Sequence, residues 1–154
     1  MPSAHPSDSE SQRAAETLLC AQLGRKVEIS LRRERIALGD GHCVELDAFN
    51  REHLFVAEIF ARIGVLKAAQ RRKVGTDILK LLAVEKALGG SWRKALCFVD
   101  DAAAQEVRGK SWLAYVVKAE RIEVFVLPVS ADARASILAS QEKQYMTNLS
   151  RDDG

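Results

Sequence analysis

The sequence lacks most of the features that assign a protein to a functional class at first sight. It has only three cysteines, Cys20, Cys43 and Cys97, and their spacing matches no metal-binding motif. Each cysteine lies in an apolar stretch, so we expect reduced thiols in the core of a cytoplasmic protein rather than a disulfide framework. The chain also contains no zinc motif, glycine-rich phosphate loop, nucleophile elbow or RNA-binding aromatic signature, which excludes the corresponding kinds of site.

The net charge is small, and long hydrophobic runs are absent. The 154 residues carry 23 basic and 21 acidic side chains, and a net charge of +2 is too small to imply a polyanionic partner by itself. No apolar run approaches the roughly 20 residues that cross a bilayer, and the polar start with its two prolines is unlike a signal peptide. We therefore expect no membrane partner. With 47% hydrophobic and 29% charged residues, the composition is that of a globular domain with a substantial core.

The chain divides into two short tails and one domain. Residues 1–9 are rich in serine and proline, and we expect a disordered tail there. Residues 10–146 form a single α/β domain, and the polar residues 147–154 are expected to fray. Within the domain, residues 11–23 are typical of a helix that ends at Gly24. A weak strand is predicted over residues 27–31.

Most of the strands have clearer signals. The run Gly39-Asp40-Gly41 predicts a hairpin between strands at residues 35–38 and 42–48. Residues 54–61 are apolar almost throughout, which is typical of a central strand covered on both faces. A long helix follows at residues 65–88, and a strand at 95–99. A helix from Asp100 or Asp101 to about residue 118, a strand at 122–127 and a helix at 130–146 complete the order α-β-β-β-α-β-α-β-α.

Two acidic residues on neighbouring predicted strands stand out. Glu58 lies inside the apolar run, where an unpaired carboxylate is costly to bury, and Asp47 ends the strand before it. A divalent cation, Mg²⁺ or Mn²⁺, held between the two strands would account for both. Two alternatives stay open. Asp47 can cap the turn at Asn50, and Glu58 can form a buried ion pair with Arg62 or Lys73.

The element order together with these residues resembles the PD-(D/E)XK nuclease superfamily. Asp47 matches the acidic residue of the second strand, and Glu58-Ile59-Phe60 matches the Glu-x-Lys of the third. The resemblance implies a restriction-endonuclease-like fold, with a central mixed sheet flanked by helices and metal-dependent hydrolysis of phosphodiester bonds. Glu16 matches a further acidic position of the superfamily, although we expect it to face solvent. The chain departs from the pattern at Phe60, which stands where the superfamily has lysine.

The long helix offers a substitute for this lysine. Its core-facing stripe carries four polar residues, Gln70, Lys73, Asp77 and Lys80, where apolar residues are usual. Some members of the superfamily are similar in taking their lysine from this helix, which makes Lys73 the candidate and Lys67 the alternative. Lys73 and Asp77 can equally form a pair within the helix, because they are four residues apart.

Basic clusters give a weaker indication of nucleic acid. Arg32, Arg33 and Arg35 precede the hairpin, and Arg71 and Arg72 lie in the long helix. Such clusters can follow a phosphate backbone, although a solvated surface accounts for each one by itself. Two functions stay open: a magnesium-dependent endonuclease or exonuclease, and an inactive member of the same fold that binds nucleic acid or a protein.

Overall fold

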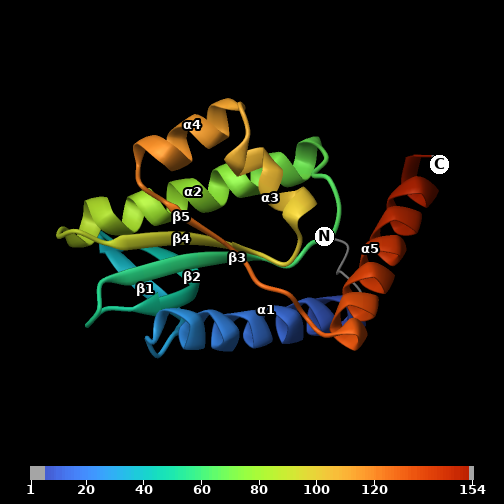
Figure 1. The fold of residues 1–154 in the computed structure, drawn as a ribbon, viewed down its shortest axis with the longest axis horizontal. Coiled ribbons are helices and arrows are strands. Elements are labelled where there is room, and N and C mark those ends of the chain that lie inside the picture. The colour runs from blue at the N-terminus through green and yellow to red at the C-terminus, as the bar shows by residue number, and fades with distance from the viewer. Residues whose placement is uncertain (1–5, 153–154) are drawn as a thin grey trace.

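A five-stranded sheet between two layers of helices forms the centre of the protein (Figure 1), as a computed structural model describes it for residues 6–152. In chain order the elements are α1 (Pro6–Val27), β1 (Arg32–Gly39), β2 (His42–Asn50), β3 (Phe55–Phe60), α2 (Ala68–Leu88), β4 (Arg93–Phe98), α3 (Asp101–Arg108), α4 (Trp112–Ala119), β5 (Glu123–Val126) and α5 (Ala131–Asp152). None of these helices is long and apolar enough to cross a lipid bilayer.

The sheet is mixed, and β3 lies at its centre. The strands follow the order β1-β2-β3-β4-β5, with antiparallel pairing from β1 to β3 and parallel pairing from β3 to β5. Parallel neighbours need a crossover connection, and α2 supplies it between β3 and β4. All six residues of β3 are buried. The prediction that the strands of Asp47 and Glu58 are neighbours in a mixed sheet is therefore confirmed.

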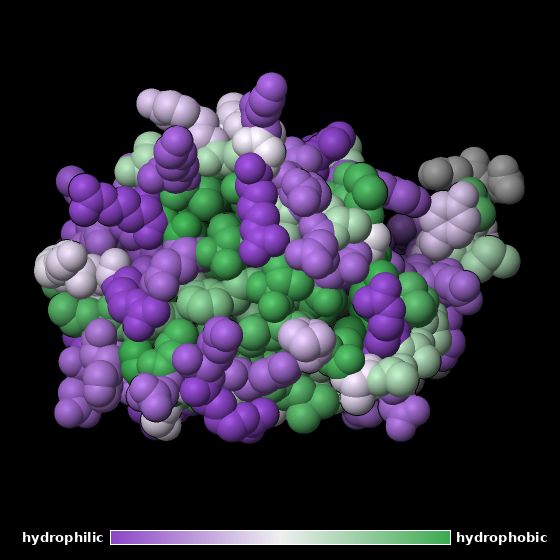
Figure 2. Space-filling view, in the orientation of Figure 1, coloured by the Kyte–Doolittle hydropathy of each residue, from purple (hydrophilic) through white to green (hydrophobic). Residues whose placement is uncertain are grey.

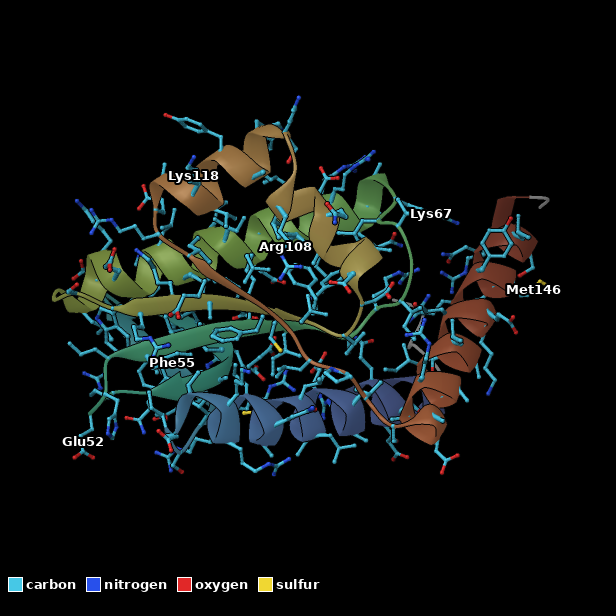
Figure 3. The ribbon with its side chains drawn as sticks, in the orientation of Figure 1. Glu52, Phe55, Lys67, Arg108, Lys118 and Met146 are labelled. Atoms are coloured by element: carbon cyan, nitrogen blue, oxygen red, sulfur yellow. The ribbon has the colours of Figure 1, made fainter. Side chains whose placement is uncertain are left out.

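Each face of the sheet carries its own apolar core. Helices α2, α3 and α4 cover one face and α1 covers the other (Figure 1). Side chains alternate along β3, so Val56 and Phe60 join the core under α2, while Phe55 and Ile59 join the core on the α1 side. Figure 3 shows Phe55 between the sheet and α1. Glu58 shares the face of Val56 and Phe60 and therefore points toward α2.

The first helix is longer than the sequence predicted. It begins at Pro6, within the expected disordered tail, and continues through Gly24 to Val27; residues 1–5 lie outside the described part of the chain. The strand predicted at residues 27–31 was wrong, because the chain turns there at Glu28, with a φ of 58°. Gly24 does not end the helix; its missing side chain allows the backbone of the following turn to pass close to it. A Cβ atom at Gly24 would lie 2.8 Å from the carbonyl oxygen of Ile29.

The C-terminal half differs from the prediction at two places. The single helix expected up to residue 118 is two helices, because α3 ends before Gly109 and the Ser111 side chain caps α4 by accepting a hydrogen bond from the Ala114 N–H at 3.1 Å. The element order is therefore α-β-β-β-α-β-α-α-β-α. Helix α5 continues to Asp152 through most of the expected frayed tail. Met146 lies on its outer side (Figure 3).

Smaller differences concern boundaries and one thiol. Strand β1 begins three residues earlier than predicted, and α2 begins at Ala68 rather than at residue 65. Cys20 and Cys97 are buried free thiols as expected, but Cys43 is exposed. On the face seen in Figure 2, apolar side chains show between hydrophilic ones along α2 and the sheet. A groove between α2 and α4 is lined by Gly75, Ile78, Leu79, Trp112 and Leu113 among others.

Candidate functional site

A bulge in β2 positions Asp47. In the pairing of β1 with β2, Arg32 opposes Phe49 and Glu34 opposes Leu46, so the single residue Arg33 faces both Asp47 and Ala48. Bulges of this kind turn a side chain away from the regular alternation and are frequent near active sites. The freed Asp47 carboxylate accepts a hydrogen bond through Oδ2 from the Ile59 N–H on β3, at 2.9 Å. The bulge thus directs the side chain of Asp47 toward β3, the strand that carries Glu58.

Glu58 lies at the centre of the sheet with 1% of its surface exposed. Its Oε1 atom is 2.9 Å from the Nζ atom of Lys80, which reaches it from α2. The contact is an ion pair without good hydrogen-bond alignment, and Oε1 has no other donor. The alternative partners predicted for Glu58, Arg62 and Lys73, do not pair with it. A buried carboxylate oxygen with incomplete hydrogen bonding requires a functional or structural reason.

The neighbouring Asp47 affects the carboxyl group of Glu58. Burial, followed by the hydrogen bond to Asp47 and the negative charge of Asp47, raises the pKa of Glu58 to about 9, and Lys80 offsets only part of this increase. Glu58 therefore keeps its proton at neutral pH while no cation is bound. Burial alone would lower the pKa of Lys80, but the close contact with Glu58 and the charges of Glu58, Asp77 and Asp47 outweigh it and raise that pKa.

A second ion pair lies one helical turn before Lys80. The Nζ atom of Lys73 is 3.5 Å from Oδ2 of Asp77, as the spacing of four residues allows. Asp77 is buried, with 5% of its surface exposed. Burial raises the pKa of Asp77, although the charges of Lys73 and Lys80 act in the opposite direction. Lys73 also lies over the ring of Phe60, 5.2 Å from its centroid. Lys73, Asp77 and Lys80 of the predicted stripe thus form a row of charged groups along α2, and Lys80 connects this row to Glu58.

Glu16 brings the first helix to the same place. Its side chain is only 15% exposed, so the expectation that it faces solvent was wrong. Burial and then the charge of Asp47 raise the pKa of Glu16, whereas Arg33, 3.7 Å away, lowers it. The site thus combines carboxylates from α1, β2 and β3 with ammonium groups from α2, and its more exposed members, Asp47 and Lys73, open it to solvent.

The remaining predicted residues have other contacts. Gln70 accepts a hydrogen bond from the Lys67 N–H at 2.7 Å and closes the first turn of α2 instead of facing the carboxylates. Lys67 lies over the Tyr145 ring. Each arginine near the hairpin has a partner within the protein: Arg32 pairs with Glu34, Arg33 with Glu45, and Arg35 donates to the thiol of Cys43. Arg71 and Arg72 line the groove between α2 and α4.

The donor set fits a hard divalent cation in part. Among residues 6–152, no group of three or more His, Cys, Asp or Glu side chains is arranged to hold a metal ion. Asp47 and Glu58 nevertheless offer two oxygen donors side by side, and Oε1 of Glu58 lacks an aligned hydrogen bond. Mg²⁺ is commonly held by one or two carboxylates that are completed by waters and substrate phosphates. The pair therefore suits Mg²⁺ or Mn²⁺ in the presence of a phosphate ligand.

Comparison with known proteins finds no match to a protein family, to a curated protein or to a solved structure. The chemistry of the site therefore rests on its own residues.

Proposed function

We propose that the chain is a divalent-metal-dependent nuclease of restriction-endonuclease-like fold, which hydrolyses phosphodiester bonds in nucleic acid. The observation that carries the proposal is the contact of the Lys80 ammonium with Glu58, 2.9 Å apart, beside the carboxylate of Asp47. This contact supports an Asp-Glu-Lys constellation in which the lysine comes from a helix. A purely structural ion pair would not need Asp47 next to Glu58, because a second carboxylate there raises the cost of burial.

Each residue of the constellation has a distinct task. Asp47 and Glu58 would hold Mg²⁺ or Mn²⁺, and Glu58 keeps its proton until the cation is present. The bound metal would lower the pKa of a water molecule and offset charge on the phosphate. Lys80 holds its ammonium beside Glu58, where it stabilises negative charge that develops on the phosphate. Lys73, which is more exposed and lies over Phe60, adds a second positive charge on the solvent side.

Cleavage assays with carboxylate variants test this function. Supercoiled plasmid, linear DNA and RNA are incubated with the highly purified natural protein in Mg²⁺ or Mn²⁺. Cleavage should fall about 100-fold or more in Asp47→Asn and Glu58→Gln, the range seen when a group that stabilises the transition state is removed. Glu45→Gln, an exposed carboxylate of the same strand, is the matched control and should cleave like the natural protein. Failure of the natural protein to cut any of these substrates would overturn the proposal.

A second function has one observation in its favour. Lys80 already contacts Glu58 without a metal, at 2.9 Å, which suits an inactive member of the fold that binds nucleic acid or a protein. Such a protein would bind labelled DNA or RNA with an affinity that does not depend on Mg²⁺ or on the Glu58→Gln change, and it would cut neither.

A further inference from the structure

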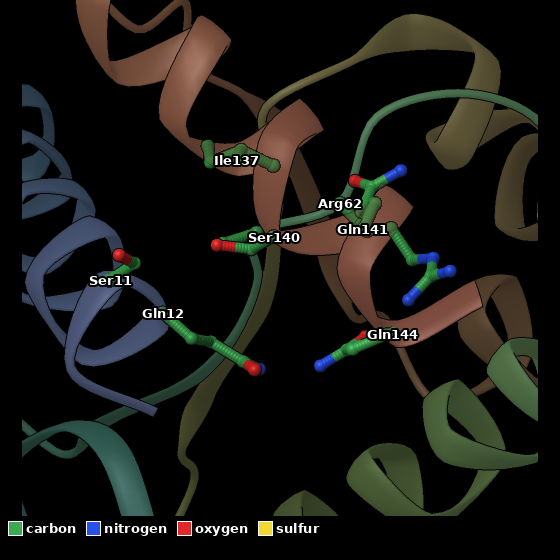
Figure 4. A pocket seen from close by; sticks show the side chains of 8 residues that line it. Ser11, Gln12, Arg62, Ile137, Ser140, Gln141 and Gln144 are labelled. Atoms are coloured by element: carbon green, nitrogen blue, oxygen red, sulfur yellow. The ribbon is translucent and has the colours of Figure 1, made fainter. Parts of the chain in front are cut away.

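A small pocket lies between the two terminal helices and the segment that follows β3 (Figure 4). Its volume is about 40 Å³, and its polar lining consists of Ser11, Gln12, Arg62, Ser140, Gln141 and Gln144. No acidic side chain lines it. Figure 4 shows Gln12 of α1 and Gln144 of α5 reaching toward each other across the space. Hydroxyl, amide and guanidinium groups thus offer hydrogen-bond donors in a lining that also includes Ala61 and Ile137.

The wall that carries Arg62 is fixed in place by α5. The Gln141 side chain accepts a hydrogen bond from the Ile63 N–H at 2.8 Å and donates one to the Ile63 carbonyl oxygen at 3.1 Å. These two bonds attach the backbone next to Arg62 to the helix. Two hydrogen bonds from one side chain thus tie the Arg62 wall of the pocket to α5.

Arg62 is the one charged residue of the lining, and its guanidinium is half-buried. Among residues 10–151, whose side chains the structure describes, no carboxylate lies within ion-pair distance of it, whereas Arg32 and Arg33 each have such a partner. Burial lowers the pKa of Arg62 without any compensating neighbour. A half-buried guanidinium without a counter-ion suits an anionic ligand, and arginine matches the geometry of a phosphate group.

The pocket lies beside the proposed catalytic site. The Gln12 amide donates to Glu16 at 3.3 Å, and Glu16 is close enough to Asp47 for the charge of Asp47 to raise its pKa. Along β3 and beyond, Arg62 follows Glu58 by four residues, which at about 3.3 Å per residue places the two at most about 13 Å apart. One nucleic-acid strand can span that distance within a few nucleotides.

We propose that this pocket holds a backbone phosphate of the substrate strand, a few nucleotides from the bond that is cut at Asp47 and Glu58. The proposal rests on the proposed nuclease function. The size of the pocket supports it, because one water molecule needs about 10–15 Å³ of cavity volume. A pocket of about 40 Å³ therefore holds the equivalent of about three water molecules, which suits a phosphate group better than a nucleobase. Arg62 is a positioning residue here, since it contacts the strand away from the reacting bond.

Neutral substitutions in the nucleic acid test the pocket directly. Binding of a labelled DNA strand and duplex is measured by fluorescence anisotropy, with Ca²⁺ in place of Mg²⁺. In a series of oligonucleotides, one phosphate at a time is replaced by an uncharged methylphosphonate. For the natural protein, one position away from the scissile phosphate should weaken binding about tenfold. For Arg62→Gln that position should have no further effect, because the contact is already lost.

Two more variants complete the experiment. Arg51→Gln, which removes a charge from the exposed turn between β2 and β3, should keep the full effect of the sensitive position. Gln144→Leu removes a polar group from the pocket but keeps the charge of Arg62, so it should reduce in part the loss of binding at the sensitive phosphate position. It keeps the test decisive if Arg62→Gln does not fold. Thermal melts of all variants accompany the titrations. An equal methylphosphonate profile in natural protein and Arg62→Gln would overturn the pocket while leaving cleavage at Asp47 and Glu58 intact. Absence of any binding by the natural protein would overturn both proposals.

Discussion

The ammonium of Lys73 lies 5.2 Å from the centre of the Phe60 ring. Helix α2 therefore places a positive charge next to Phe60, the strand position that lacks a lysine. Lys80, about two turns later on the same stripe of α2, contacts Glu58 itself. The two lysines therefore differ in their surroundings. Lys80 is 27% exposed and faces the carboxylate pair, whereas Lys73 is 49% exposed and pairs with Asp77.

This difference predicts unequal effects on cleavage. Lys80→Met should reduce plasmid nicking about 100-fold, because it removes the cation next to Glu58, and Lys73→Met about tenfold, because its charge is more screened by solvent. Thermal melts of the same preparations separate loss of activity from loss of fold. If Lys73→Met abolishes nicking and Lys80→Met does not, the catalytic role belongs to Lys73. Cleavage that survives both changes would leave Lys67 to be tested.

Metal binding should depend on both carboxylates. Calorimetric titration with Mn²⁺ is expected to show weak binding to the natural protein without nucleic acid, because two carboxylates are an incomplete ligand set. Asp47→Ala and Glu58→Ala should each remove this binding, and affinity should rise with pH because Glu58 must lose its proton to serve as a ligand. Glu45→Ala is the control and should titrate like the natural protein. Identical titrations for all four proteins would remove the proposed metal site.

The pKa of Glu58 also predicts how stability changes with pH when metal is absent. The unfolded carboxyl loses its proton near pH 4.5, but the folded one keeps it up to about pH 9. The resulting stabilisation is present below pH 4.5 and is lost as the pH rises toward 9. Asp77 and Glu16, whose pKa values are also raised, contribute in the same direction.

Urea unfolding in the presence of a chelator measures this effect. The free energy of unfolding of the natural protein should fall by up to about 6 kcal/mol between acidic and alkaline pH, because the pKa of Glu58 is 4.5 when unfolded and about 9 when folded, and one pKa unit corresponds to about 1.36 kcal/mol. Glu58→Gln mimics the protonated carboxyl and should remove most of the decrease in the free energy of unfolding with rising pH. Glu45→Gln should follow the natural curve. Parallel curves for the natural protein and Glu58→Gln would show that Glu58 is ionised in the folded state.

Two glycines in helices are expected to respond in opposite ways to alanine. A Cβ atom at Gly24 would lie 2.8 Å from the backbone oxygen of Ile29, whereas one at Gly75 would lie 3.6 Å from a methyl carbon of Leu113. Gly24→Ala should therefore lower the free energy of unfolding by about 1–3 kcal/mol, and Gly75→Ala should raise it by up to about 1 kcal/mol through helix propensity. Urea denaturation compares the two. A stabilising Gly24→Ala would contradict the close approach of the turn after α1.

The central part of the sheet was predictable because its signals are local. The apolar run around Glu58 identified β3, and two glycines around Asp40 identified the hairpin, where all three residues have positive φ. Asp47 was recognised as a partner of Glu58 from the order of the strands. The bulge that aims Asp47 was not predictable, since it depends on the pairing of β1 with β2 and not on a residue type.

The choice between Lys73 and Lys80 lay beyond the sequence. Helical phase puts both on one stripe, but they are separated along the helix axis by about 10 Å. Which of them meets Glu58 depends on the path of the segment between β3 and α2. Glu16 was missed for a similar reason, because a weakly amphipathic helix does not indicate which of its charged residues lies against the sheet.

The α3–α4 boundary and the length of α5 were missed on different grounds. Gly109 interrupts a pattern that is otherwise helical on both sides, and a single glycine does not by itself end a helix. Residues 147–152 are polar, so propensity alone gave no reason to extend α5 through them. Cys43 lies in an apolar stretch of the sequence, but in the structure it stands at the hairpin end of β2, where side chains are exposed to solvent.

The amide of Gln141 has a practical consequence for anyone who shortens or fuses this protein. It attaches α5 to Ile63, and the segment beginning there leads directly into the helix that carries Lys73 and Lys80. A version that stops ahead of Gln141 would remove both hydrogen bonds to this segment, although no residue of the carboxylate pair had been removed. A fusion partner attached beyond Asp152 keeps the connection. The last helix therefore belongs to the scaffold of the site, and the minimal unit worth producing includes it.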